Sequence, residues 1–106
     1  MFAQQKIETE FIYKYDIGER REPRTLTMEL HEGKFSPLLH FVGGPTGHET
    51  YQVTSEFIVS LMRQGAVSDE FCICAGTKNS WPKCSVSIRA TLNFLSKALK
   101  NQRLRE

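Results

Sequence analysis

The N-terminal residues alternate between apolar and polar side chains with a period of two. The β-branched and aromatic members of one set are Ile7, Thr9, Phe11, Tyr13, Tyr15 and Ile17. The other set, from Lys6 to Asp16, is mainly charged. Because successive side chains of a strand point to opposite faces, the pattern predicts a β-strand with one face in water.

Two more strands are predicted to follow the first. Residues 18–23 are polar and end in proline, which indicates a turn, and residues 25–31 alternate again. Residues 32–34 fit a tight hairpin turn, and residues 35–42 form the third strand. Proline cannot donate to a sheet ladder, so Pro37 places this strand at an edge or makes it begin later.

The middle of the chain changes to helical spacing. Apolar side chains on one predicted helical face are Val53, Phe57, Ile58, Leu61 and Met62. This places a helix within residues 50–64, stopped by Gly65. Its start is open, because residues 51–54 could be extended and Ser55 could cap a shorter helix.

The last third contains a short apolar segment and a second helix. Residues 70–75 predict a buried strand, residues 76–84 a loop, and residues from about 85 to 103 a helix. The apolar stripe of that helix is Ile88, Leu92, Leu95 and Leu99. The order β-β-β-α-β-α predicts one α+β domain over residues 1–106, a mostly antiparallel four-stranded sheet with two helices packed on one face.

Composition points to a reducing compartment. Three cysteines leave one unpaired in any disulfide scheme, and no apolar run reaches the length of about 20 residues that spans a bilayer. The first residues also lack a basic start followed by an apolar run. We therefore expect a cytoplasmic protein with no membrane partner.

Charge is divided unevenly along the chain. Residues 76–106 hold seven basic residues and one acidic residue, for +6, whereas residues 1–75 hold seven basic and eleven acidic residues, for −4. Such a split can attract an anionic partner or a second copy of the chain.

The basic residues of the last third are the first candidate site. The anion-binding or nucleic-acid-binding candidates are Lys83, Arg89, Lys97, Lys100 and Arg103, with Trp81 available to stack on bases. Helical spacing places Arg89, Lys100 and Arg103 on one flank of the apolar stripe, bordered by Lys97. The alternative is a solvated face whose cations complement the helix dipole.

A glycine-rich loop is the second candidate site. Its residues Gly43, Gly44, Gly47 and His48 could hold a phosphate or carboxylate of a small molecule through backbone N–H groups. The spacing fits neither a P-loop nor a dinucleotide fingerprint. The alternative is a plain turn from strand to helix.

The cysteines suggest one reactive thiol. Cys84 is expected just before a helix start and beside Lys83, where positive potential lowers a thiol pKa. Cys72 and Cys74 are expected to share one face of the buried strand and to pack as small hydrophobes. The Cys-x2-Cys spacing of structural zinc sites is absent from the sequence, so we expect no metal and no cofactor.

Histidines offer a weaker signal. His31 and His40 become cross-strand neighbours if residues 32–34 form the hairpin, with Glu29 or Glu49 close by. They could form an acid–base pair, a weak metal site or an ordinary surface pair. No sequence context marks a nucleophile, and we assign no catalytic residue.

Three functions are consistent with the sequence. The favoured one is a small non-catalytic binding module for an acidic macromolecule, either nucleic acid or an acidic protein surface. The second is a small-molecule-binding domain or enzyme with its site at the Gly43–Gly47 loop. The third is a homo-oligomeric adaptor that uses edge strands and opposite charges.

Overall fold

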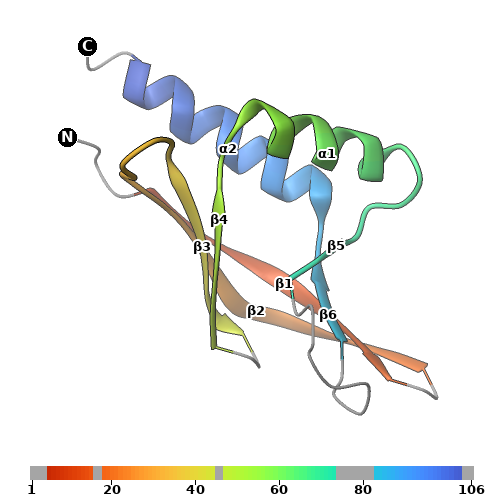
Figure 1. Ribbon diagram of the computed structural model, residues 1–106. Coiled ribbons are helices and arrows are strands. Elements are labelled where there is room, and N and C mark those ends of the chain that lie inside the picture. Colours follow the sequence, from red (N-terminus) through yellow and green to blue (C-terminus); the bar gives the residue numbers. More distant parts are fainter. Residues whose placement is uncertain (1–4, 16–17, 45–46, 74–82, 104–106) are drawn as a thin grey trace.

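The computed structural model describes residues 5–15, 18–44, 47–73 and 83–103 (Figure 1). The strands are β1 (Gln5–Tyr15), β2 (Gly18–His31), β3 (Leu38–Gly44), β4 (Gly47–Gln52), β5 (Phe71–Cys72) and β6 (Lys83–Val86). The helices are α1 (Ser55–Gly65) and α2 (Ile88–Arg103).

The strands form a single antiparallel sheet with both helices on one face (Figure 1). Its strand order is β4-β3-β2-β1-β6-β5, and every neighbouring pair is antiparallel. The α+β class, the antiparallel sheet and the one-sided helical layer predicted from the sequence are therefore confirmed. The sheet is wider than expected, with six strands in the described residues.

The strand β4 was not predicted as such, although residues 51 and 52 belong to the segment that the sequence left open as extended. Its Tyr51 pairs with Leu39 of β3 and packs against the core, so the segment gains both a ladder and apolar burial. The shorter version of the first helix is the observed one, and its N-cap is Thr54, whose hydroxyl accepts a hydrogen bond from the backbone N–H of Phe57 at 3.1 Å.

The strand β6 replaces the expected start of the second helix. Cys84 and Val86 alternate into the core, which favours extended backbone over helix. Helix α2 therefore begins at Ile88 rather than near residue 85. The predicted strand over residues 70–75 is reduced to Phe71–Cys72 in the described residues.

Of the two alternatives that Pro37 left open for the third strand, the later start is observed and the edge position is not. Strand β3 lies inside the sheet between β2 and β4, and β4 is the outer strand. Pro37 is tolerated because β3 begins at Leu38, after the proline. The carbonyl of Pro37 accepts a hydrogen bond from the backbone N–H of Val53 at 2.8 Å, which ties the strand to the segment before α1.

The core lies between the sheet and the helices. Its fully buried side chains include Leu26, Met28 and Leu30 of β2, Leu39 and Phe41 of β3, Leu61 of α1 and Leu95 of α2. Four rings, those of Phe41, Tyr51, Phe57 and Phe71, lie with centroids 5.1 to 6.0 Å apart. These contacts hold α1 against the β3–β4–β5 part of the fold and leave the outer surface of both helices facing solvent.

Candidate anion-binding face

Helix α2 separates apolar and basic side chains onto opposite faces. Its buried residues are Ile88, Thr91, Phe94, Leu95 and Ala98. Its exposed residues include Arg89, Lys97 and Lys100, and no acidic residue occurs anywhere in the helix. The helix is therefore fixed by one face and presents positive charge on the other.

Arg89, Lys97 and Lys100 lie on one side of the α2 axis. At 3.6 residues per turn, Arg89 and Lys100 differ by about 20° around the axis and lie about 16 Å apart along it, while Lys97 is about 80° from Arg89. Three members of the predicted basic set therefore share one outward face. Lys83 lies in β6 and Arg103 ends α2, but their side chains, like all of Trp81, lie outside the described part of the chain.

An acidic residue from a distant loop caps the start of α2. The carboxylate of Asp69 accepts hydrogen bonds from the Ser87 hydroxyl and the Arg89 backbone N–H, each at 2.7 Å. The Ser87 hydroxyl in turn accepts from the backbone N–H of Ala90 at 3.0 Å. Two backbone N–H groups of the first turn are thus satisfied, as helix capping requires.

The charge of Asp69 follows from this geometry. Partial burial acts to raise the pKa of Asp69, but the Ser87 and Arg89 hydrogen bonds and the Arg89 guanidinium outweigh it and hold the pKa below its ordinary value. The carboxylate is therefore ionised at neutral pH and offsets part of the Arg89 charge. Among the residues that the structure describes, Lys97 and Lys100 make no ion pair, so they carry most of the outward charge.

The outer surface of α1 has a different chemistry. Met62 and Val59 are 59% and 44% exposed, although Met62 was predicted to lie in the apolar core stripe of this helix. That prediction is wrong because α2 packs against the Gly65 flank of α1, where an added Cβ at Gly65 would approach Ile88 Cγ2 at 3.2 Å. Met62 is left at the outer border of this contact.

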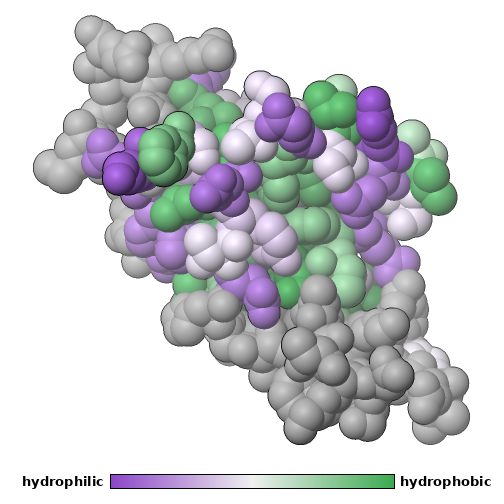
Figure 2. Space-filling view, in the orientation of Figure 1, coloured by the Kyte–Doolittle hydropathy of each residue, from purple (hydrophilic) through white to green (hydrophobic). Residues whose placement is uncertain are grey.

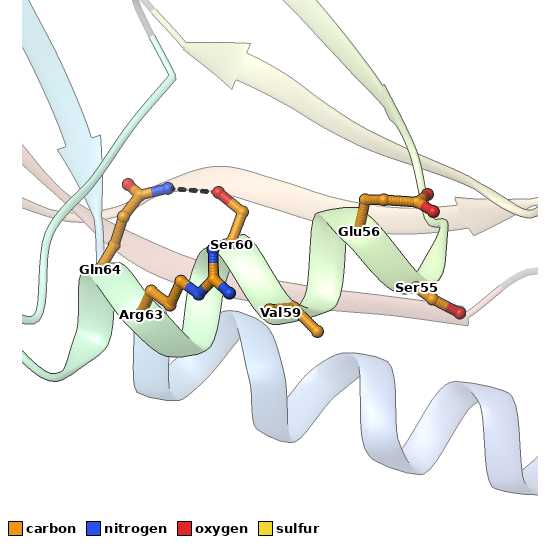
Figure 3. Close-up of a pocket in the computed structure, with 6 residues that line it drawn as sticks. All are labelled: Ser55, Glu56, Val59, Ser60, Arg63 and Gln64. Atoms are coloured by element: carbon orange, nitrogen blue, oxygen red, sulfur yellow. Dashed lines mark hydrogen bonds between the residues drawn. The ribbon is translucent and has the colours of Figure 1, made fainter.

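Two hollows adjoin the exposed apolar residues of α1. One, of about 430 Å³, lies between the helices and is lined in part by Met62, Ile88, Arg89 and Leu92. The other, of about 450 Å³, runs along α1 alone (Figure 3). Its labelled residues are Ser55, Glu56, Val59, Ser60, Arg63 and Gln64, with Gln64 Nε2 donating to Ser60 Oγ at 3.1 Å. One helix supplies all of these residues, so this second hollow is an open depression.

The glycine loop lies far from any helix start. Gly44 and Gly47 pair as the ends of β3 and β4, and Gly43 has a φ of 93°, which glycine adopts without strain. The turn is at the end of the sheet that points away from the helices (Figure 1). The loop therefore joins two strands rather than strand and helix, and no helix dipole is available there for an anion. The side chain of His48 lies outside the described residues.

The cysteines do not occupy the predicted environments. Cys84 is 0% exposed inside the core, in a strand rather than at a helix start, so it packs as a small hydrophobe. Cys72 is exposed, the reverse of the expectation, because Phe71 and Ile73 on either side of it point into the core. Cys74 lies outside the described residues.

The two histidines are neighbours on the open face of the sheet, as predicted. Their ring centroids are 4.1 Å apart, His31 Nε2 donates to Glu29 Oε1 at 2.8 Å, and Thr50 Oγ1 lies 3.4 Å from His40 Nδ1. The carboxylate and the hydroxyl contact different imidazoles, unlike the arrangement that activates a nucleophile. Within the described ranges, no group of three or more His, Cys, Asp or Glu side chains could hold a metal ion.

The residues that connect distant segments carry little signal in the sequence. Asp69 and Ser87 are 18 positions apart, and no local pattern marks their hydrogen bond. A serine directly before the first apolar residue of a helix is a weak N-cap signal that could have suggested Ser87. The exposure of Val59 and Met62 depends on where α2 packs, which periodicity within one helix cannot reveal.

An α+β sheet covered on one face by two helices is thus the class of this protein. No protein-family model, curated protein or solved structure matches the chain. Neither helix in the described residues has the length and apolar character needed to cross a membrane.

Proposed function

We propose that this protein is a small non-catalytic binding module that takes an acidic macromolecule on the outward face of α2. The observation that carries the proposal is the common direction of Arg89, Lys97 and Lys100 on a helix without acidic residues. Cations held on one rigid face attract polyanions from a distance and release counterions on contact.

The helix dipole does not account for this set of cations. Lysines near the C-terminus of a helix are favoured by its partial negative charge, which is a sufficient reason for Lys100 alone. Arg89 is the second residue of α2, where the dipole disfavours a cation. The Asp69 carboxylate supplies a local reason for Arg89, and a binding role adds one reason that all three cations share.

Catalysis has weaker support than binding. The thiol of Cys84 is buried, and the Glu29–His31 and His40–Thr50 pairs do not combine into one proton-transfer chain. The glycine turn also lies away from both helix starts, so a phosphate there would have the backbone N–H groups alone and no helix dipole (Figure 1). The homo-oligomer hypothesis stays a prediction, with β4 as the strand available for pairing.

A cytoplasmic location fits the same proposal. Cys72 and Cys84 are free thiols, and a buried reduced cysteine such as Cys84 is typical of proteins from reducing compartments.

Retention on immobilised heparin tests the proposal, because heparin is a simple polyanion. The variant Lys97→Gln/Lys100→Gln is compared with Arg20→Gln/Arg21→Gln, which removes equal charge from the hairpin end of β1 and β2 (Figure 1). We expect the α2 variant to elute at clearly lower salt than the control. Equal elution of the two variants, or no retention of the wild type at low salt, would contradict the proposal.

A further inference from the structure

Apolar side chains lie between two groups of cations across the outer surface of the helices. Angles around the axis of α1 give the order of its outer residues. Measured from Gly65, Met62 is at about 60°, Val59 at about 120° and Arg63 at about 160°. Gly65 faces Ile88 of α2, so Met62 is the residue nearest the partner helix and Arg63 is the farthest. The exposed apolar pair of α1 thus has a cation on its far side.

Helix α2 repeats this order in the opposite direction. Measured around the axis of α2 from Ile88, Leu92 is at about 40°, Arg89 at about 100° and Lys100 at about 120°. Leu92 is partly buried beside the interhelical groove, and Arg89 stands on the rim of the same groove. We name Val59, Met62 and Leu92 the apolar seam. Hydrophobic side chains reach the surface over the helices beside hydrophilic ones (Figure 2).

The groove next to the seam can receive a side chain. Its volume is about 430 Å³, and its apolar walls come from Met62, Ala66, Ile88 and Leu92. Methionine adapts its shape to different partners, which suits a wall that must close around an incoming group. The one acid on the rim, Asp69, is engaged with Ser87 and the start of α2.

We infer that the partner is an acidic, amphipathic helical segment of another protein, lying along the apolar seam. Its apolar side chains enter the groove, and its carboxylates meet Arg63 on one flank and Arg89 and Lys100 on the other. Lys97 is about 140° from Leu92 around α2 and lies beyond this flank. This inference rests on the proposed function and names the partner class of the same surface.

The composition of the seam favours a peptide over a nucleic acid. Bases are held by stacking on aromatic side chains, whereas the seam is made of Val59, Met62 and Leu92, which are aliphatic. Aliphatic side chains between flanking cations complement a helix that carries an apolar stripe bordered by acids.

Selection from a random peptide display library on the full-length protein tests the inference. We expect retained peptides to be rich in Asp and Glu and to carry apolar residues at helical spacing. The variant Met62→Gln/Val59→Thr should weaken the best peptide about tenfold or more, since it removes apolar contact without changing charge. Val67→Thr is the matched control, because Val67 is 89% exposed and lies outside the groove.

The outcomes separate this inference from the proposed function. Weakening by both the seam variant and Lys97→Gln/Lys100→Gln, with Val67→Thr unchanged, supports both. Two outcomes overturn the peptide inference and keep the proposed function. In the first, only the lysine variant weakens peptide binding. In the second, a single-stranded oligonucleotide displaces the peptide and binds the seam variant as well as it binds the wild type. Failure of both peptides and oligonucleotides to bind at low salt overturns both.

Discussion

The two helices cover the same face of one sheet but divide their surfaces differently. Among the side chains that the structure describes, α2 has five buried residues, whereas the buried residue of α1 is Leu61. Outward, α2 presents cations and α1 presents Val59 and Met62 beside Arg63. Both are amphipathic, so this difference is invisible to a measure of periodicity alone.

The difference shows which part of the surface serves folding. The inner face of α2 supplies enough apolar burial to hold that helix, and its outer face is free to carry charge. Helix α1 keeps apolar area in water that contributes little to its own anchoring. Exposed apolar area bordered by charge is typical of a binding surface rather than a folding requirement.

The largest expected effects come from the inner faces. Leu95→Ala in α2 should lower the free energy of unfolding by about 3 to 5 kcal/mol, because it leaves a cavity among buried neighbours. Leu61→Ala in α1 should cost about 2 to 3 kcal/mol. Helix α1 is less buried than α2, so it can move to fill part of the cavity that the substitution leaves. Urea denaturation measures both, and a larger loss for Leu61→Ala would reverse the ranking of the two helices.

The next effect concerns the cap that belongs to α2. Asp69→Asn and Ser87→Ala should each cost about 0.5 to 2 kcal/mol. The first removes the acceptor of the Ser87 hydroxyl, and the second removes the acceptor of the Ala90 N–H. Urea denaturation of the two variants and their double variant at neutral pH measures this. Full additivity of the two changes would contradict a shared cap.

The same cap predicts a pH dependence. The pKa of Asp69 is lowered by folding, so its stabilisation is present above the pKa of the unfolded chain and is lost as pH falls through the folded value. The stability lost between neutral pH and about pH 3 should be smaller in Asp69→Asn than in the wild type. Salt should reduce this difference, because Asp69 is exposed.

Much of the fold could be predicted because its signals are local. Alternation in residues 5–15 and 26–30 and helical spacing in residues 88–99 each depend on neighbouring positions. Strand β6 was not predicted, and only the end of β4 was left open as extended; both strands are short and depend on pairing with their neighbours. Tyr51 and Cys84 acquire strand geometry from the pairs Tyr51–Leu39 and Cys84–Tyr13, which no local pattern contains.

The candidate site also has features that the sequence predicts and features that depend on tertiary packing. The common direction of Arg89, Lys97 and Lys100 follows from spacing within one helix, so the sequence predicts it. The seam requires the placement of α1 against α2, and the Asp69–Ser87 contact requires the path of the chain between them. Tertiary packing therefore decides which apolar residues, Met62 among them, remain in water.

The smallest expected effects come from the outer faces. Lys97→Gln/Lys100→Gln should change the free energy of unfolding by less than about 0.5 kcal/mol, because both side chains are exposed and make no ion pair within the described residues. Met62→Gln/Val59→Thr should cost less than about 1 kcal/mol, since both side chains already contact water. Urea denaturation of the two variants beside the wild type checks this order. A loss of several kcal/mol from the seam variant would mean that the outer face of α1 holds the fold together, and its binding phenotype would then report unfolding. Near-neutral values would instead allow each loss of binding to be assigned to the surface on which the substitution lies.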